Sequence, residues 1–471
     1  MGEAMQVFTD DALGDLDGVG VAQRIASGEI SAAEAVQAAI ERARKADVEL
    51  NAVQYEAFER ARVAARSVRA STDRPFAGVP SFIKDNNDVA GMPTCHGSAA
   101  LSPHPVKRTF PCAEQFLAQG YVVLGKSTMP EFGLTATTEF FDRPPTRNPW
   151  NPDFSAGASS GGSAALVASG AVPVAHANDG GGSIRIPAAA CGLVGLKTTR
   201  ARLLDEPGAR LLPVNVAAEG VVSRTVRDTA HHLAAMERTH RNRRLPLVGL
   251  VEGPGKRRLR IGLATASPNG VELHPETLAQ VRATAELLAS LGHDVDEMTL
   301  SVDPRFERDF GLYWGFFADL LSLSSRLAHR GHYDATKLDP FTKGLAAMWR
   351  RDRKRLPGAI RSLRSAVAGY DAMFVDRDVV LSPTLNHPTP ELGYLSPNVD
   401  FEEVFGRLTR YVGFTPINNV SGGPAISLPT PVGANNLPGA VHLSAAHGDE
   451  RTLLQLAYEL EQARPFPALA T

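Results

Sequence analysis

Two segments rich in glycine and serine contain the residues best suited to chemistry. In the second segment, 178–185, three consecutive glycines stand directly before Ser183. Glycine leaves the backbone bare, so a substrate carbonyl can approach closely, and successive N–H groups can converge to stabilise an oxyanion. A serine at this position is well placed to attack the same carbonyl. The segment therefore favours acyl transfer, with Ser183 as nucleophile and a backbone oxyanion hole at Gly180, Gly181 and Gly182.

The glycine spacing of the two segments also allows other interpretations. A phosphate-binding Walker A loop needs a lysine that does not follow here, and a dinucleotide-binding turn needs a different glycine pattern. The first segment, 157–163, contains Gly-Ala-Ser159-Ser-Gly, the spacing of an α/β-hydrolase nucleophile elbow. Two prolines in residues 148–155 disfavour the strand that an elbow follows. An elbow at Ser159 would also need a later histidine, and the candidates are His387, His442 and His447.

A lysine at the end of an apolar run is the third candidate. Lys84 directly follows Phe82 and Ile83. Burial of a lysine disfavours the ammonium form and lowers the pKa, and a neutral amine near pH 7 can act as a general base. The alternative is a lysine at a strand end that reaches solvent, as most lysines do.

Taken together, these segments resemble the amidase-signature family. The matching motifs are Gly-Val-Pro-x-x-x-Lys-Asp at 78–85, Gly-x-Ser-Ser-Gly-Gly-Ser at 157–163 and Asp-x-Gly-Gly-Ser-Ile-Arg-Ile-Pro at 179–187. The two key serines are 24 residues apart, as in the family pattern. Weaker resemblance at 27–31 and 419–429 extends the likeness over nearly the whole chain.

The resemblance implies a role for each residue of these motifs. Ser183 resembles the nucleophile, Ser159 the serine that relays protons, and Lys84 the general base. In the family the relay serine follows a cis peptide bond, which here is the bond from Ala158. The implied oxyanion hole comprises the backbone of Gly180, Gly181, Gly182 and Ser183. The other implied residues are Ser160, Asp179 and Arg185 as supports, and Thr137 and Ala158 as substrate contacts.

The implied activity is that of an amidohydrolase that cleaves a linear carboxamide C–N bond through an acyl-enzyme on Ser183. The products are a carboxylate and ammonia or an amine, which corresponds to EC 3.5.1.- and most closely to EC 3.5.1.4. The likeness is nearest to bacterial stand-alone amidases, including those similar to 6-aminohexanoate cyclic dimer hydrolases. The implied substrate is a small aliphatic, aryl or oligoamide, and neither a metal ion nor a cofactor is implied. Two alternatives are the glutaminase (A) subunit of an aminoacyl-tRNA amidotransferase and a catalytically inactive binding or scaffold protein.

An aromatic helical segment between residues 305 and 356 is the candidate for a substrate-pocket wall. Its alternative role is core packing. The aromatic side chains favour a substrate more apolar than glutamine, and they are Phe306, Phe310, Tyr313, Trp314, Phe316 and Phe317.

Strands and helices must position these residues, and their pattern predicts the fold. Helical periodicity appears at 276–291, ended by Gly292, and Ser31 with Glu34 has capping-box spacing. Short apolar runs predict buried strands at residues 120–125, 171–177, 259–264, 378–381 and 425–428. Strands that alternate with helices predict an α/β fold, and the resemblance makes it a large twisted mixed β-sheet flanked on both faces by α-helices. The predicted organisation is one domain over 1–471, with an N-terminal helical segment (1–72), a signature core (73–210) and the remaining sheet and pocket helices (211–471).

The composition of the chain limits the classes of partner and the location that are expected for it. A net charge of −2 and a pI of about 6.7 give no basic surface for nucleic acid or an anionic membrane. No apolar run of about 18 residues and no leader pattern occur, so a cytoplasmic location is expected. The three dispersed cysteines, Cys95, Cys112 and Cys191, are expected to be free thiols. The expected partners are a small-molecule amide and a second copy in a homodimer.

Overall fold

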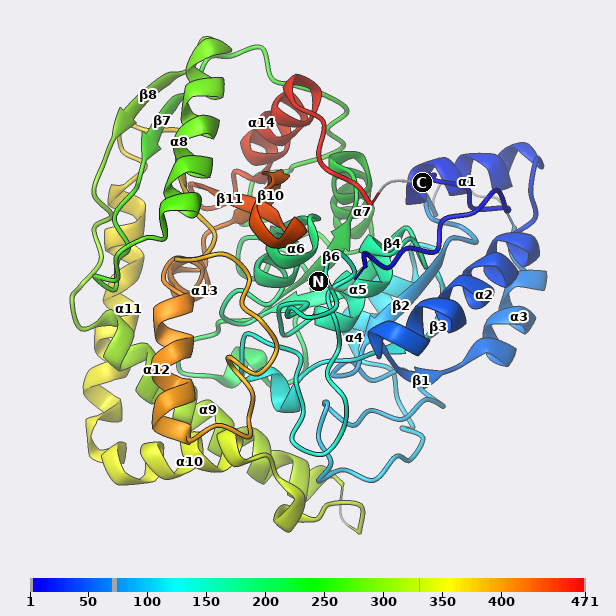
Figure 1. Cartoon of the computed structure of the whole chain (residues 1–471), viewed down its shortest axis with the longest axis horizontal. Coiled ribbons are helices and arrows are strands. Elements are labelled where there is room, and N and C mark those ends of the chain that lie inside the picture. Colours follow the sequence, from blue (N-terminus) through cyan, green and yellow to red (C-terminus); the bar gives the residue numbers. More distant parts are fainter. Residues whose placement is uncertain (1–2, 70–73, 330, 470–471) are drawn as a thin grey trace.

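An eight-stranded mixed sheet forms the centre of the computed structural model, which describes residues 3–69, 74–329 and 331–469 (Figure 1). Neighbouring strands run antiparallel, except that β7 is parallel to both β8 and β9. The strand order is β4 (Val174–Asp179), β6 (Ala218–Ser223), β5 (Val194–Lys197), β10 (Ala425–Val432), β11 (Pro438–Ala445), β9 (Val379–Pro383), β7 (Arg260–Leu263) and β8 (Asp294–Glu297). The predicted α/β fold with a large mixed sheet is confirmed.

A smaller three-stranded sheet brings Lys84 to the large one. Its order is β1 (Val53–Glu56), β3 (Val122–Ser127) and β2 (Pro80–Lys84), and all five residues of β2 are buried. The Ser81 hydroxyl donates to the Val174 carbonyl oxygen of β4 at 2.9 Å. Strand β2 is thereby held beside β4, and Lys84 at its end lies close to the loop that follows β4.

Helices surround both sheets. The N-terminal helices lie on one side of the molecule and α9 to α12 on the opposite side (Figure 1). No helix in the described ranges combines the length and the apolar character that a bilayer span requires. The helices are α1 (Gly18–Ser27), α2 (Ala32–Leu50), α3 (Phe58–Arg66), α4 (Pro111–Leu117), α5 (Gly161–Ala168), α6 (Arg185–Cys191), α7 (Val226–Thr239), α8 (Pro275–Ser290), α9 (Phe306–Ala328), α10 (Pro340–Asp352), α11 (Leu356–Ala372), α12 (Phe401–Tyr411), α13 (Pro416–Ser421) and α14 (Glu450–Ala463).

Most predicted elements occur close to their expected positions. The capping box at the start of α2 is present, with Ser31 Oγ accepting from the Glu34 N–H at 3.1 Å. The predicted strands 120–125 and 171–177 begin two and three residues too early relative to β3 and β4. The N-terminal segment contains β1 as well as helices, and its residues 1–2 and 70–72 lie outside the described residues. Strand β6 lies between β4 and β5, so segments 73–210 and 211–471 interleave in one sheet.

Candidate active site

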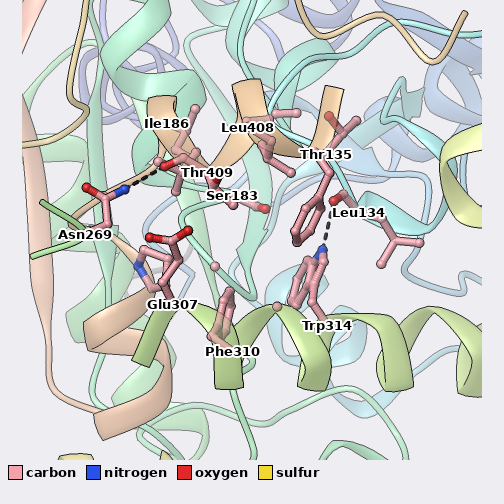
Figure 2. A pocket seen from close by; sticks show the side chains of 18 of the residues that line it. Leu134, Thr135, Ser183, Ile186, Asn269, Glu307, Phe310, Trp314, Leu408 and Thr409 are labelled. Carbon is pink, nitrogen blue, oxygen red and sulfur yellow. Dashed lines mark hydrogen bonds between the residues drawn. The ribbon is translucent and has the colours of Figure 1, made fainter. Parts of the chain in front are cut away.

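Ser183 lies in the tight turn that joins β4 to α6. Gly182 in this turn has a φ of +134°, and a Cβ atom there would stand 2.4 Å from Thr415 Oγ1, so the position requires glycine. Thr415 Oγ1 also donates to the Gly181 carbonyl oxygen at 2.7 Å. The Ser183 side chain is 8% exposed and its hydroxyl lies at a pocket (Figure 2). The turn thus presents one nearly buried hydroxyl to an opening.

A buried ion pair holds this turn in shape. Both oxygens of Asp179 accept from Arg185, from Nε and Nη2 at 3.0 Å each, and neither side chain is exposed. Asn419 Nδ2 adds a hydrogen bond to Asp179 at 2.8 Å. Burial alone would raise the pKa of the Asp179 carboxyl, but the Arg185 guanidinium holds it well below its ordinary value. The predicted supports Asp179 and Arg185 therefore act together as one charged brace.

The ion pair of Asp179 and Arg185 engages one of the N–H groups that were predicted for the oxyanion hole. The Gly182 N–H donates to Asp179 Oδ1 at 2.7 Å and is therefore engaged within the turn. Among the described residues, the N–H groups of Gly180, Gly181 and Ser183 form no hydrogen bond. These three N–H groups are therefore available to an oxyanion, whereas the Gly182 N–H is engaged by Asp179.

Lys84 is completely buried beside the first serine segment. Its Nζ donates to Ser159 Oγ at 2.7 Å and to Asn178 Oδ1 at 2.6 Å. Burial lowers the pKa of Lys84 to about 7, although the carboxylates of Glu206, Glu219 and Asp179 oppose the shift. A large fraction of this amine is therefore neutral at neutral pH.

The first serine segment places Ser159 between Lys84 and the Ser183 turn. The Ala158–Ser159 peptide bond is cis, as the resemblance implied. A Cβ atom at Gly161 would stand 2.2 Å from Thr138 Oγ1, so the packing of this segment depends on small residues. Ser160 Oγ donates to the Ser183 carbonyl oxygen at 2.6 Å. The segment therefore fixes the backbone of Ser183 as well as the Ser159 hydroxyl.

A buried polar network behind Lys84 was not anticipated. Asn178 Nδ2 donates to Glu206 Oε1 at 2.6 Å, which turns Asn178 Oδ1 toward Lys84. Asn86 Nδ2 donates to the same Glu206 oxygen at 2.6 Å. Burial and the nearby Glu219 raise the pKa of the Glu206 carboxyl. Asn178 belongs to the glycine- and serine-rich segment 178–185, whereas no pattern in the sequence around Glu206 indicates a place in the site.

The nucleophile-elbow interpretation does not fit this geometry. No strand occurs within the described residues 148–155 that precede Ser159. His442 lies between Arg185 Nη1 at 2.9 Å and Ser382 Oγ at 3.3 Å. His447 contacts Asp371 at 2.7 Å, and His387 accepts no serine hydroxyl. Ser159 is therefore paired with Lys84 and with none of these histidines.

Two openings meet at Ser183. The aromatic pocket is lined by Leu134, Thr135, Ala158, Gly181, Ser183, Ile186, Asn269, Phe306, Glu307, Phe310, Trp314, Leu408, Thr409 and neighbouring residues (Figure 2). The wide cavity, about 600 Å³, is lined by His96, Ser159, Asn178, Gly180, Ser183, Glu206, Trp314, Phe316, Phe317, Ser324 and neighbouring residues. Trp314 separates the two openings and donates from Nε1 to the Leu134 carbonyl oxygen at 2.9 Å. The aromatic segment therefore supplies walls of both openings. Tyr313 is the exception among its aromatic residues, because it is fully buried and donates to the Val214 carbonyl oxygen.

One predicted substrate contact lies elsewhere. Thr137 is fully buried, its hydroxyl bonds Glu139 and Ser155 at 2.9 Å each, and it lines neither opening. Thr135, two residues earlier, lines the aromatic pocket, and its buried Oγ1 has no hydrogen-bond partner among the residues that the structure describes. The prediction for Thr137 is therefore wrong. Ala158 lines the pocket as predicted.

Replacement of Asp179 by asparagine is expected to destabilise the fold by about 3–5 kcal/mol, because it leaves the buried Arg185 charge uncompensated. The measurement is the free energy of unfolding from chemical denaturation. A matched control is Asp376→Asn, which removes an exposed ion pair with Arg377 and should change stability by no more than about 0.5 kcal/mol. Equal stability of the two variants would contradict a bracing role for Asp179.

Comparison with known proteins agrees with this geometry. The sequence model of the Amidase family matches residues 34–454. The amidase-named AmiC of Mycobacterium tuberculosis is 48% identical over 463 residues, covering 98% of this chain and 97% of AmiC. The 6-aminohexanoate-cyclic-dimer hydrolase of Paenarthrobacter ureafaciens is 35% identical, covering 96% and 95%. The solved structure of a 6-aminohexanoate cyclic dimer hydrolase with substrate superposes with a TM-score of 0.87 at 31% identity, covering 96% of this chain and 98% of that one. The chain therefore belongs to the amidase family, the amidase-signature enzymes that hydrolyse amide C–N bonds.

Proposed function

We propose that Lys84, Ser159 and Ser183 form a catalytic triad that hydrolyses a linear carboxamide through an acyl-enzyme, an activity of the EC 3.5.1.4 type. The observation that carries the proposal is the 2.7 Å hydrogen bond from a fully buried Lys84 to Ser159. Because burial lowers the pKa of this lysine to about 7, it can accept a proton at neutral pH. Histidine is not required in such a relay.

The proposed reaction begins with proton transfer from Ser183 through Ser159 to Lys84, while Ser183 Oγ bonds to the amide carbon. The oxyanion that forms is stabilised by the free N–H groups of Gly180, Gly181 and Ser183. The C–N bond then breaks, and the leaving nitrogen takes the proton back through Ser159. Water then loses a proton along the same path while its oxygen bonds to the acyl carbon. The ester bond to Ser183 Oγ breaks, the proton returns through Ser159 to Ser183, and the carboxylic acid leaves as the carboxylate.

One step of this relay depends on rotation of a hydroxyl. Among the described residues no group forms a hydrogen bond with Ser183 Oγ, so no such bond has to break before this hydroxyl turns toward Ser159 or the substrate. Ser160 and the Asp179 brace hold the Ser183 backbone during such a rotation. Both serines line the wide cavity, which gives the proton path a common opening.

A fluorophosphonate probe tests this proposal directly, because it forms a stable covalent adduct with an activated serine. We expect peptide mass spectrometry to locate the adduct on Ser183, with slower labelling in Ser159→Ala and Lys84→Ala. Turnover of a linear and a cyclic amide, measured on the same preparation, identifies the preferred substrate type. An adduct on Ser159 would contradict the assigned nucleophile, and faster turnover of the cyclic amide would contradict the linear preference.

A further inference from the structure

Glu307 is a charged side chain at the mouth of the aromatic pocket, in the first turn of α9 (Figure 2). The arginines on either side of it are already paired, Arg305 with Asp303 at 2.8 Å and Arg308 with Asp309 at 2.8 Å. Among the described residues Glu307 forms no ion pair and no hydrogen bond. Burial raises the pKa of its carboxyl, and no neighbouring cation offsets that shift. The pocket therefore carries an uncompensated negative charge when the carboxyl is ionised.

The polar side chains of Asn269 and Thr409, which also line this pocket, form hydrogen bonds within the protein. Asn269 Nδ2 donates to the Thr409 carbonyl oxygen at 2.7 Å (Figure 2), and its Oδ1 accepts from Ser267 Oγ at 2.6 Å. Most of the remaining walls are apolar, with Ile186, Phe306, Phe310, Trp314 and Leu408, and the hydroxyl of Thr135 is among the polar groups of the lining. A ligand that reaches this end consequently meets apolar surface and one carboxylate.

The spacing along α9 connects this carboxylate with the nucleophile turn. Glu307, Phe310 and Trp314 follow at helical intervals of three and four residues and share one face of the helix. A Cβ atom at Gly181 would stand 3.6 Å from the Phe310 ring, and one at Gly180 would stand 3.5 Å from the Trp314 ring. From Phe310, beside Gly181, to Glu307 the helix rises about 4.5 Å at 1.5 Å per residue. A short aliphatic chain bound at Ser183 can span this length.

The positions of the catalytic residues indicate which opening receives the acyl chain of an amide substrate and which receives its amine. Ser159, which returns the proton to the leaving nitrogen in the proposed mechanism, lines the wide cavity and not the aromatic pocket. The leaving amine is therefore best accommodated in the wide cavity. The acyl chain then extends along the aromatic pocket toward Glu307.

We propose that Glu307 selects amides whose aliphatic acyl chain ends in a cationic amine, which it binds at the mouth of the aromatic pocket. This inference rests on the proposed function, since it uses the acyl-enzyme at Ser183 to orient the substrate. Glu307 acts here as a specificity-determining residue that contacts the substrate away from the reacting atoms.

The test compares two 4-nitroanilides of equal length, 5-aminopentanoyl and hexanoyl, which differ by an ammonium in place of a methyl group. We expect the ratio of their kcat/KM values to fall about fivefold in Glu307→Gln, the range of a partly exposed ion pair. Hydrolysis of the hexanoyl compound should stay unchanged. Glu402→Gln on α12 removes the same charge from an exposed position outside the pocket and should leave the ratio as in the wild type.

Binding of the same compounds to Ser183→Ala, measured by calorimetry, separates this inference from the catalytic proposal. We expect the ratio of the Kd values of the 5-aminopentanoyl and hexanoyl compounds to change by the same factor when Glu307→Gln is added to Ser183→Ala. This expectation holds whether or not the wild type hydrolyses anilides. Absence of hydrolysis with a shifted Kd ratio would overturn the proposed function alone. An unchanged ratio in both measurements would overturn the role of Glu307. The role would also be overturned if Glu307→Gln affected only substrates that carry the ammonium on the leaving amine and not on the acyl chain.

Discussion

Replacing Ser183 with alanine is expected to lower kcat/KM for an amide substrate by about 10⁵- to 10⁶-fold. The loss is large because the substitution removes the atom that bonds the acyl group, while the Asp179 brace and the free N–H donors stay in place. The measurement is steady-state hydrolysis of a chromogenic anilide. Thermal denaturation of the same sample shows whether the fold is retained, since only a small side chain is lost.

A serine elsewhere in the same cavity provides the matched control. Ser324 lines the wide cavity from α9, and its hydroxyl donates to the Leu321 carbonyl oxygen at 3.0 Å. Ser324→Ala should leave kcat/KM within about twofold of the wild type, as expected for a substitution away from the reacting atoms. Comparable activity of Ser183→Ala and Ser324→Ala would show that Ser183 is not the nucleophile.

The candidate residues that the structure brings together are those whose neighbours in the chain constrain them. Ser183 follows glycines that the turn requires, as Gly182 shows by its φ and its contact with Thr415. Lys84 ends an apolar run that forms a buried strand. Local composition therefore marked the lysine, Ser159 and Ser183, although they come from three separate segments of the chain.

The features that the sequence did not predict depend on contacts between distant segments. Thr135 and Thr137 are similar residues in one irregular segment, and only packing against Glu139 and Ser155 decides which hydroxyl is buried away from the pocket. Glu206 accepts hydrogen bonds from Asn178 and Asn86, which are 28 and 120 residues away along the chain. The Gly182 N–H is engaged by Asp179 only because the turn folds back on the end of β4. No single-sequence pattern encodes such pairings.

Replacing Lys84 with methionine is expected to lower kcat/KM by about 10³- to 10⁴-fold at neutral pH, because it removes the proposed general base. Methionine has a similar length and no charge, so the buried site should remain filled. The loss should not add to that of Ser183→Ala, since groups that act as one unit are strongly non-additive. A double variant much slower than Ser183→Ala would indicate that Lys84 acts outside the relay.

The pH profile identifies the base, provided that a second buried lysine is tested beside it. The neutral amine is the active form, and the pKa of Lys84 is about 7, so kcat/KM should fall about tenfold per pH unit as pH drops below 7. Burial also lowers the pKa of Lys197 to about 7, but within the described part of the chain its Nζ donates only to the carbonyl oxygens of Thr198 and Gly423. We therefore expect Lys197→Met to keep this acid limb and Lys84→Met to lose it. The reverse result, or a wild-type rate that is constant from pH 5 to 9, would show that Lys84 is not the base whose neutral form carries the reaction.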